Sequence, residues 1–433
     1  MMNIIVVGLW HLGCVTAASL AKAGHHVLAY DACRETIVNL QQGKPPIFEP
    51  GLEALLKECQ TAGTLTFTHS IPHFSDGDLI WVTFDTPVDA HEVADVDYVM
   101  REVENLFPYL QTKNLVVISS QIPVGTTNKL QKKCDQLYPE KHITFAYIPE
   151  NLRLEKAIAV FTHPDRVIIG LDNHHYKDHI QKLLQPFTDH FIWMSILSAE
   201  MTKHAINAFL AVSVTFINEL SVLCEAVGAN AREVERGLKS EARIGPHAYL
   251  RPGDAIAGGT LLRDIHYLIQ LGKEQDEHTF LFSALLDSNH HHKKWACQKL
   301  LDVLKDLRNT KIAVLGLTYK AGTDTLRCSM AIETCKWLHE QGSEVQAYDP
   351  VIQQLPEGYA SFIQLKSNVT DAIRAADAVI ISTAWPQFSE LNAETLVAHL
   401  RQPFVFDPSG FIASNIQQDT RIKYFSVGIP VCN

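Results

Sequence analysis

The sequence lacks the features that mark a membrane, exported or nucleic-acid-binding protein. Its first residues, MMNIIVVGLW, enter an apolar strand pattern without a basic region or a cleavage site. No apolar run reaches the roughly 20 residues that a membrane span needs. The formal charge of −11 offers no basic excess for a nucleic acid. We therefore expect a cytoplasmic protein with no membrane partner and no nucleic-acid partner.

Metal-ligand patterns are also missing. The nine cysteines form no CxxC pair and no spacing with histidine that is typical of a metal site. An odd, unpatterned set of cysteines is typical of reduced thiols in a cytosol. His290, His291 and His292 are consecutive, and adjacent residues on a helix point about 100° apart. We therefore expect these histidines on a solvated helix surface, and we predict no metal.

Short apolar runs alternate with helical patterns in the first half of the chain. Such continuous runs are typical of strands that are buried on both faces of a parallel sheet. The alternation predicts a doubly wound α/β domain over residues 1–196. The runs are NIIVVG from Asn3, HVLAYD from His26, DLIWVTF from Asp78, LVVISS from Leu115, ITFAYI from Ile143 and RVIIG from Arg166.

From Ser198 the pattern becomes helical and free of strands. The stretch that begins AEMTKHAINAFLA predicts a helix of about 30 residues, long enough to span a dimer interface. Helical patterning then lasts to about Leu307. KIAVLGLTYK, EVQAYDP, DAVIISTAW and PFVFDPSG supply strands of a second α/β series. We predict two Rossmann-like domains, 1–196 and 307–433, joined by a central helical dimerisation domain, 197–306.

The segment GLWHLG, Gly8 to Gly13, lies between the first predicted strand and the first predicted helix. Asp31 follows at the end of the second strand. A dinucleotide fold places a pyrophosphate on this helix end and an acid on the adenosine ribose. A bare strand–turn–helix is the alternative. Trp10 replaces the middle glycine, so its indole must point away from the cofactor or crowd it. Asp31 favours NAD over NADP.

KHAIN places Lys203 and Asn207 on one helix face, because they lie four residues apart. A lysine and an amide that converge on one oxygen polarise an alcohol or stabilise an alkoxide. A solvated Lys–Asn pair is the alternative. Neighbours such as Ile206 and Phe209 indicate a mostly buried helix, which favours the functional interpretation.

PGDAIAGGTLLRD, Pro252 to Asp264, has the composition of a loop that presents a reactive group. Its glycines and alanines allow close approach to the backbone. The only nucleophile available in it is Thr260.

Together these segments resemble the UDP-glucose/GDP-mannose dehydrogenase family nearly from end to end. Further matching segments, in the family's order, are GKPPIFEPGLEALL, PVGTT, PDRVIIG, RIGPHAYLRPG, LGLTYKAGTDTLR and AYDP. The resemblance implies an NAD domain, a dimerising central helix and a nucleotide-sugar domain. It also implies oxidation of a sugar's primary alcohol to a carboxylate in two hydride transfers. Those transfers pass through a cysteine thiohemiacetal and a thioester.

Carried over position by position, the resemblance implies three sets of site residues. Lys203 and Asn207 match an oxyanion-stabilising pair, Asp264 matches an aspartate that orders water, and Arg243 matches an arginine that reaches the partner subunit's substrate. The catalytic set is Lys203, Asn207, Asp264, Glu150 and Thr260. The cofactor set is Gly8, Trp10, His11, Leu12, Gly13, Asp31, Thr86, Gln121, Arg263 and Arg327. The substrate set is Glu150, Leu152, Lys203, Asn207, Arg243, Tyr249, Leu250, Gly258 and Lys320.

The departures from the family lie in the chemistry. Thr260 stands at the cysteine position, Arg263 at a lysine, Gln121 at a threonine and Asp85 at a glycine. A thiol with a pKa near 8.5 attacks an aldehyde readily. A threonine hydroxyl is a poor nucleophile without a dedicated base. We therefore predict that Thr260 forms no thioester-like intermediate and that the second oxidation, as the family performs it, is lost or very slow.

Two hypotheses follow. The first is an NAD-dependent dehydrogenase of polysaccharide biosynthesis that oxidises an alcohol of a nucleotide sugar, or of a related small molecule, by one hydride transfer. The related β-hydroxyacid dehydrogenases carry a Lys-x-x-x-Asn face and transfer one hydride, so this reduced chemistry has a precedent by analogy. The second is a catalytically inactive nucleotide-sugar- or dinucleotide-binding protein with a regulatory or scaffolding role. Trp10, Asp85, Gln121 and Thr260 motivate that alternative. We expect a homodimer in both cases.

Overall fold

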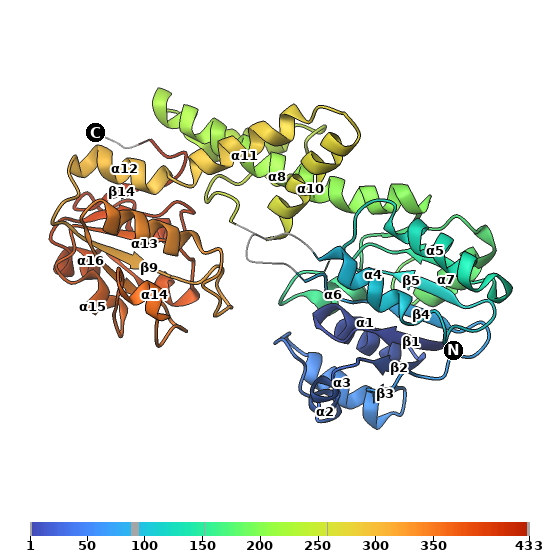
Figure 1. Cartoon of the computed structure of the whole chain (residues 1–433). Helices are drawn as coiled ribbons and strands as arrows, with labels where there is room; N and C mark the ends of the chain where they lie inside the picture. The colour runs from blue at the N-terminus through green and yellow to red at the C-terminus, as the bar shows by residue number, and fades with distance from the viewer. Residues whose placement is uncertain (1, 88–94, 151, 258, 431–433) are drawn as a thin grey trace. The chain divides into compact units, whose positions relative to one another are not determined.

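The computed structural model describes residues 2–87, 95–150, 152–257 and 259–430 (Figure 1). The chain divides into two compact units, Met1–Ile206 and Asn207–Asn433. The central helical segment and the second α/β series belong to the same unit. The two predicted boundaries between the three domains stay predictions.

The first unit is built on an eight-stranded sheet with the order β3-β2-β1-β4-β5-β6-β7-β8. Its first six strands have the 3-2-1-4-5-6 order of a dinucleotide-binding fold. All six predicted strands are confirmed, while β3 and β8 escaped prediction. The strands are β1 (Asn3–Val7), β2 (His26–Tyr30), β3 (Leu65–Thr68), β4 (Leu79–Val82), β5 (Leu115–Ile118), β6 (Thr144–Tyr147), β7 (Val167–Gly170) and β8 (Phe191–Met194).

Successive residues of β1 point into two separate apolar clusters. Ile4 and Val6 belong to one cluster, and Ile5 and Val7 belong to the other. A strand that is buried on both faces must be apolar throughout, which explains the run NIIVV. In the first cluster α1 packs against α3 and α6. The helices of this unit are α1 (His11–Lys22), α2 (Arg34–Gln41), α3 (Leu52–Thr61), α4 (Val96–Glu104), α5 (Thr126–Leu137), α6 (Ala157–Thr162) and α7 (Lys177–Leu184).

The first sheet is not parallel throughout. β6 and β7 pair antiparallel through their last residues, Tyr147 and Gly170, and β7 then pairs parallel with β8. A Cβ on Gly170 would lie 2.7 Å from the Cβ of Ala199 in α8 (Ile196–Val227). The end of β7 therefore packs directly on the long helix. The apolar run RVIIG did not indicate that this strand pairs antiparallel with β6.

The predicted long helix is confirmed as α8, which has 32 residues. By length and composition it could cross a membrane, but such a helix also forms the core of soluble proteins. Several polar side chains on it are buried, four of them between residues 200 and 207, which fits a helix packed in protein. These four are Glu200, Lys203, His204 and Asn207. After residue 207 the helix packs with α10 (Thr260–Glu274) and α11 (Phe280–His292) around a small apolar core.

The second unit also contains a parallel sheet, with the order β11-β10-β9-β12-β13-β14. This again is the 3-2-1-4-5-6 order, so the prediction of two Rossmann-like sheets is confirmed. The strands are β9 (Lys311–Leu315), β10 (Glu344–Tyr348), β11 (Gln364–Leu365), β12 (Ala378–Ile381), β13 (Phe404–Phe406) and β14 (Lys423–Phe425). The remaining helices are α9 (Ala231–Ser240), α12 (Trp295–Leu304), α13 (Met330–Glu340), α14 (Glu357–Ala360), α15 (Val369–Ile373), α16 (Ala393–His399) and α17 (Ala413–Ile416).

One histidine of the predicted solvated triplet is buried. His290 and His291 are exposed, whereas the Nε2 atom of His292 hydrogen-bonds to the carbonyl oxygen of Gly253 at 2.8 Å. Burial lowers the pKa of His292. The prediction was wrong for His292, because one side of α11 packs on the loop before α10.

Candidate active site

The glycine loop between β1 and α1 is built as a dinucleotide cradle requires. Gly8 has φ +90°, and a Cβ there would lie 2.9 Å from the backbone nitrogen of Phe84. A Cβ on Gly13 would lie 1.9 Å from the carbonyl oxygen of Gly8. The hydroxyl of Thr83 donates to that same oxygen at 2.7 Å. Neither position accepts a side chain. Gly8 and Gly13, two members of the predicted cofactor set, must therefore be glycine for this loop to form.

Trp10 occupies a position where the backbone does not require glycine. Its φ of −87° is ordinary for any residue, and it precedes the first turn of α1. The indole is 46% exposed. On its two sides, the Leu9 N–H donates to the Asp31 carboxylate at 2.8 Å, and His11 Nε2 lies 2.9 Å from Glu49 Oε2. The loop is therefore fixed around an exposed ring.

Three further cofactor-set residues lie around this loop. Leu12 is half-buried in the first turn of α1, and Thr86 and Gln121 follow β4 and β5. The hydroxyl of Thr86 donates to the carbonyl oxygen of Gln121 at 2.7 Å. Ligands of open α/β sheets bind beyond the carboxyl ends of the strands, so both residues are in the expected region. The cradle, the helix end and Asp31 fit NAD.

Lys203 and Glu150 meet within the first unit. Lys203 is 4% exposed, and its Nζ donates to the Glu150 carbonyl oxygen at 2.5 Å. The Lys203 ammonium also lies 3.4 Å from the Glu150 carboxylate. The other carboxylate oxygen of Glu150 accepts the N–H of Leu152 at 2.8 Å. These three predicted residues form one connected group at the end of β6.

Two buried residues on the same face of α8 were missed by the sequence reasoning. Glu200 accepts the N–H groups of Gly125 at 2.5 Å and Thr127 at 2.9 Å, and burial raises the pKa of its carboxyl group. His204 Nε2 lies 3.0 Å from the Ile122 carbonyl oxygen. Glu200 thus ties α8 to the PVGTT segment, and His204 ties it to the residue just before that segment. Their polar character at helical spacing from Lys203, within an apolar helix, was the available signal.

Asn207 and Asp264 meet within the second unit. Asn207 Nδ2 donates to Asp264 Oδ2 at 2.5 Å, and the two residues are 7% and 1% exposed. Thr260 is the first residue of α10 and is exposed. Its hydroxyl makes no hydrogen bond to any residue that the structure describes. The Arg263 N–H donates to the Gly259 carbonyl oxygen at 3.1 Å.

The rest of the predicted substrate set is spread over the second unit. Tyr249 is exposed and Leu250 is buried. Lys320 and Arg327 are exposed on the segment that follows β9. Its Tyr319 hydroxyl lies 3.0 Å from where a Cβ on Gly259 would stand, so this segment borders the loop before α10. Arg243 is exposed and pairs with Glu241, with Nε 3.0 Å from Oε1. Gly258 lies outside the described residues.

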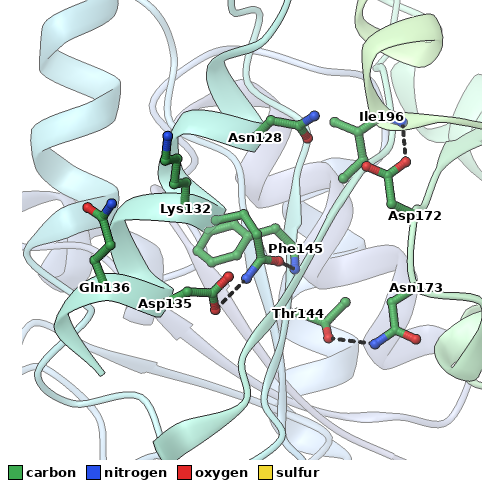
Figure 2. A pocket seen from close by; sticks show the side chains of 10 residues that line it. Asn128, Lys132, Asp135, Gln136, Thr144, Phe145, Asp172, Asn173 and Ile196 are labelled. Atoms are coloured by element: carbon green, nitrogen blue, oxygen red, sulfur yellow. Dashed lines mark hydrogen bonds between the residues drawn. The ribbon is translucent and has the colours of Figure 1, made fainter. Parts of the chain in front are cut away.

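A surface hollow of about 470 Å³ lies elsewhere in the first unit (Figure 2). Gln131 donates to Asp135, and Asn173 donates to Thr144, within it. None of its lining residues belongs to the predicted sets, so this hollow is separate from the candidate site. It is lined by Asn128, Gln131, Lys132, Asp135, Gln136, Thr144, Phe145, Asp172, Asn173 and Ile196.

The cradle and the two doubly wound sheets define an NAD-binding protein with a second Rossmann-like fold. Sequence matches agree with this class along the chain. The NAD binding domain of the UDP-glucose/GDP-mannose dehydrogenase family matches residues 2–188, its central domain 197–291 and its UDP binding domain 313–414. The chain belongs to this family of NAD-dependent oxidoreductases.

Individual relatives match over nearly their whole length. The chain is 31% identical to the UDP-glucose 6-dehydrogenase TuaD of Bacillus subtilis, covering 99% of this chain and 94% of that protein. It is 30% identical to a UDP-glucose 6-dehydrogenase of Rhizobium meliloti, covering 99% and 100%. A UDP-glucose dehydrogenase structure from Pyrobaculum islandicum matches with a TM-score of 0.85 and 27% identity, covering 99% and 98%.

Proposed function

We propose that the protein oxidises an alcohol of a nucleotide sugar to the carbonyl by a single hydride transfer to NAD. The proposal depends on a contrast between the residues assigned to hydride transfer and the residue at the expected nucleophile position. The contacts of Lys203 and Asn207 are intact, whereas Thr260 presents an exposed hydroxyl without a hydrogen-bond partner among the described residues. The UDP binding domain match and the names of the relatives support a nucleotide sugar as substrate.

NAD supplies the hydride acceptor, and the chain supplies charge and orientation. Lys203 and Asn207 lie four residues apart on α8, a spacing that puts both on one helix face, and we propose that both act on one substrate oxygen. An ammonium and an amide N–H stabilise the negative charge that develops on this oxygen. Glu150 holds the Lys203 ammonium through its carbonyl oxygen and thereby limits the positions that Nζ can take.

Asp264 is proposed to direct the proton of the alcohol to water. Its carboxylate is buried, and the Asn207 amide binds one of its oxygens. A carboxylate has about four lone-pair positions, so it can bind this amide and still orient a water molecule. In the reaction the C–H bond breaks as a hydride leaves, the O–H proton passes to this water, and the C=O bond forms. The products are the carbonyl compound, NADH and a proton.

We attribute the absence of a second oxidation to Thr260. A second oxidation in the manner of the family needs a covalent adduct between the aldehyde and an enzyme nucleophile. The Thr260 hydroxyl has no described base within hydrogen-bond reach, and an unactivated hydroxyl adds poorly to a carbonyl. The carbonyl compound is therefore released.

Turnover in the Lys203→Ala variant tests whether the chain is a catalyst. We expect a loss of about 10²- to 10⁴-fold in kcat, the range for removing one acid–base or oxyanion group. NAD affinity, measured by calorimetry, should stay within a factor of two. Lys132→Ala, in the surface hollow, is the matched control. Equal turnover in Lys203→Ala and wild type would contradict the assigned role.

We also propose that the protein is a homodimer in the cytoplasm. Phe209, Phe216 and Leu223 repeat every seven residues along α8 and are 72%, 50% and 60% exposed. A seven-residue apolar repeat is typical of a helix that packs on another helix. Beside it lies an apolar hollow of about 320 Å³ between α8 and α11. The eight described cysteines are free thiols, which supports a reducing compartment.

Sedimentation at micromolar concentration tests the dimer. Phe216→Glu places a charge on the exposed stripe and should shift the protein to monomer. Val38→Glu, on an exposed position of α2, is the control and should leave the dimer intact. A wild-type protein that sediments only as a monomer would contradict the proposal.

A further inference from the structure

Contacts of the two neighbouring residues hold the backbone of Trp10 at the cofactor cradle. Leu9 before it is 1% exposed, and its N–H is bound to Asp31. His11 after it is held by Glu49, which is 2% exposed. The Trp10 carbonyl oxygen accepts the N–H of Cys14 at 3.0 Å and so begins the α1 ladder. With the backbone fixed on both sides, the exposed indole stands at the N-terminal end of α1.

This helix end is suited to an anion. The first turn of α1 contains no acidic residue, and the residue before it provides no side-chain cap. Unsatisfied N–H groups and the helix dipole therefore favour a negative charge here. Glycine at the middle position of the loop normally lets a diphosphate approach the backbone. At residue 10 a side chain with a Cβ and a ring replaces this glycine, so the diphosphate cannot approach the backbone as closely.

The indole also offers a hydrogen-bond donor, in place of the close backbone contact that a glycine would allow. Its Nε1–H group is a donor only. It makes no hydrogen bond to any residue that the structure describes. An exposed donor without a partner, beside a helix end that favours an anion, is suited to a phosphate oxygen.

We propose that Trp10 contacts the diphosphate of NAD, with the indole N–H as a donor that replaces the close backbone contact of a glycine. The ring thereby becomes an affinity-determining residue for the dinucleotide. This inference rests on the NAD cofactor of the proposed function, and it does not depend on how many hydride transfers follow. A binding measurement without turnover therefore tests it.

The experiment is calorimetric titration of the full chain with NAD, ADP-ribose and adenosine. Trp10→Phe keeps a ring and removes the donor. We expect it to weaken NAD and ADP-ribose binding by about tenfold, since hydrogen bonds to charged groups are among the stronger ones. Adenosine affinity should not change, because adenosine has no phosphate. Trp10→Gly restores the backbone approach and should bind NAD and ADP-ribose at least as tightly as wild type. Trp193→Phe, on β8, is the control.

Three outcomes would overturn the proposal. Binding of NAD by Trp10→Phe as tight as that of wild type would exclude the N–H contact. Trp10→Gly losing as much affinity as Trp10→Phe would show that the ring does not stand in for a backbone contact. A wild type that binds adenosine but no NAD, with binding gained in Trp10→Gly, would make the ring an obstruction. Failure of all variants to bind any of the three ligands would overturn the NAD assignment as well.

Discussion

Asn207 and Asp264 are joined by a 2.5 Å hydrogen bond from Nδ2 to Oδ2, with both residues almost fully buried. The amide of Asn207 lies on α8, and the carboxylate of Asp264 lies on α10. This bond joins α8 to α10 within the second unit.

Replacing Asn207 by aspartate changes the charge of this side chain while nearly keeping its shape. Asn207→Asp would place a second carboxylate against Asp264, and buried like charges repel. We expect the free energy of unfolding to fall by about 3 kcal/mol at pH 7.5, as when a buried charge loses its partner. Urea denaturation measures this change. Asn128→Asp, in the surface hollow, is the control and should change stability by less than ~0.5 kcal/mol. Equal stability of the two variants would contradict the buried contact.

Gly13→Ala should remove dinucleotide binding. The added Cβ would lie 1.9 Å from the Gly8 carbonyl oxygen, so α1 must move away from β1 and the cradle must open. We expect NAD affinity to fall by more than about 100-fold, with a stability loss in the 1–3 kcal/mol range for overpacking. Calorimetry and thermal unfolding measure the two effects. Gly237→Ala, in α9 where a Cβ meets nothing within 4 Å, is the control and should keep NAD affinity. Normal NAD binding by Gly13→Ala would argue against this cradle.

Asp254 should make stability depend on pH. Burial raises the pKa of its carboxyl group to about 7, nearby Asp407 adds to the rise, and Arg251 opposes it. Because this pKa is above the unfolded value of 3.8, the contribution of Asp254 is fully present below about pH 4 and is lost as pH rises through 7. Asp254→Asn should therefore be more stable than wild type at pH 8, and the difference should shrink toward pH 4.

The pH effect is measured by urea denaturation between pH 4 and 8. Asp306→Asn is the matched control, because Arg308 lowers the pKa of Asp306 to about 2 and its titration lies outside this window. A stability difference between Asp254→Asn and wild type that stays constant from pH 4 to 8 would refute the assignment.

Thr260→Cys should create the covalent chemistry that we propose the wild type does not perform. A thiol at the first turn of α10 lies at a helix N-terminus, where thiolates are stabilised. We expect this variant to form an enzyme adduct with the aldehyde, detectable as added mass on the intact protein. Thr260→Ser is the control and should form none. A covalent adduct on the wild-type protein would contradict the proposed role of Thr260.

Much of the fold was predictable because burial on both faces leaves an unmistakable pattern. The NIIVV run of β1 must be apolar to fill two clusters, and the alternation of such runs with helices sets the strand order. β3 escaped prediction because LTFT alternates buried and exposed positions and is only four residues long. β8 escaped because its residues are only partly buried.

The site was less predictable because its contacts join distant segments. Lys203 and Asn207 were identified by their helical spacing, but Asp264 lies 57 residues beyond Asn207 and entered only through the family resemblance. Glu200 lies outside the KHAIN motif, and His204 lies within it but was not singled out from the sequence. Their role appears only in the structure, where Glu200 binds the PVGTT segment to α8 and His204 binds Ile122 just before it. For Trp10, the sequence left open whether the indole leaves the loop, and the structure places it exposed.

The amount of NADH released per molecule of nucleotide sugar consumed tests the central claim most directly. It is measured spectrophotometrically, together with the mass of the product, for UDP-, GDP- and CMP-sugars in turn. The account predicts a ratio near one and a product two mass units below the substrate. A ratio near two, with a carboxylate as product, would contradict it.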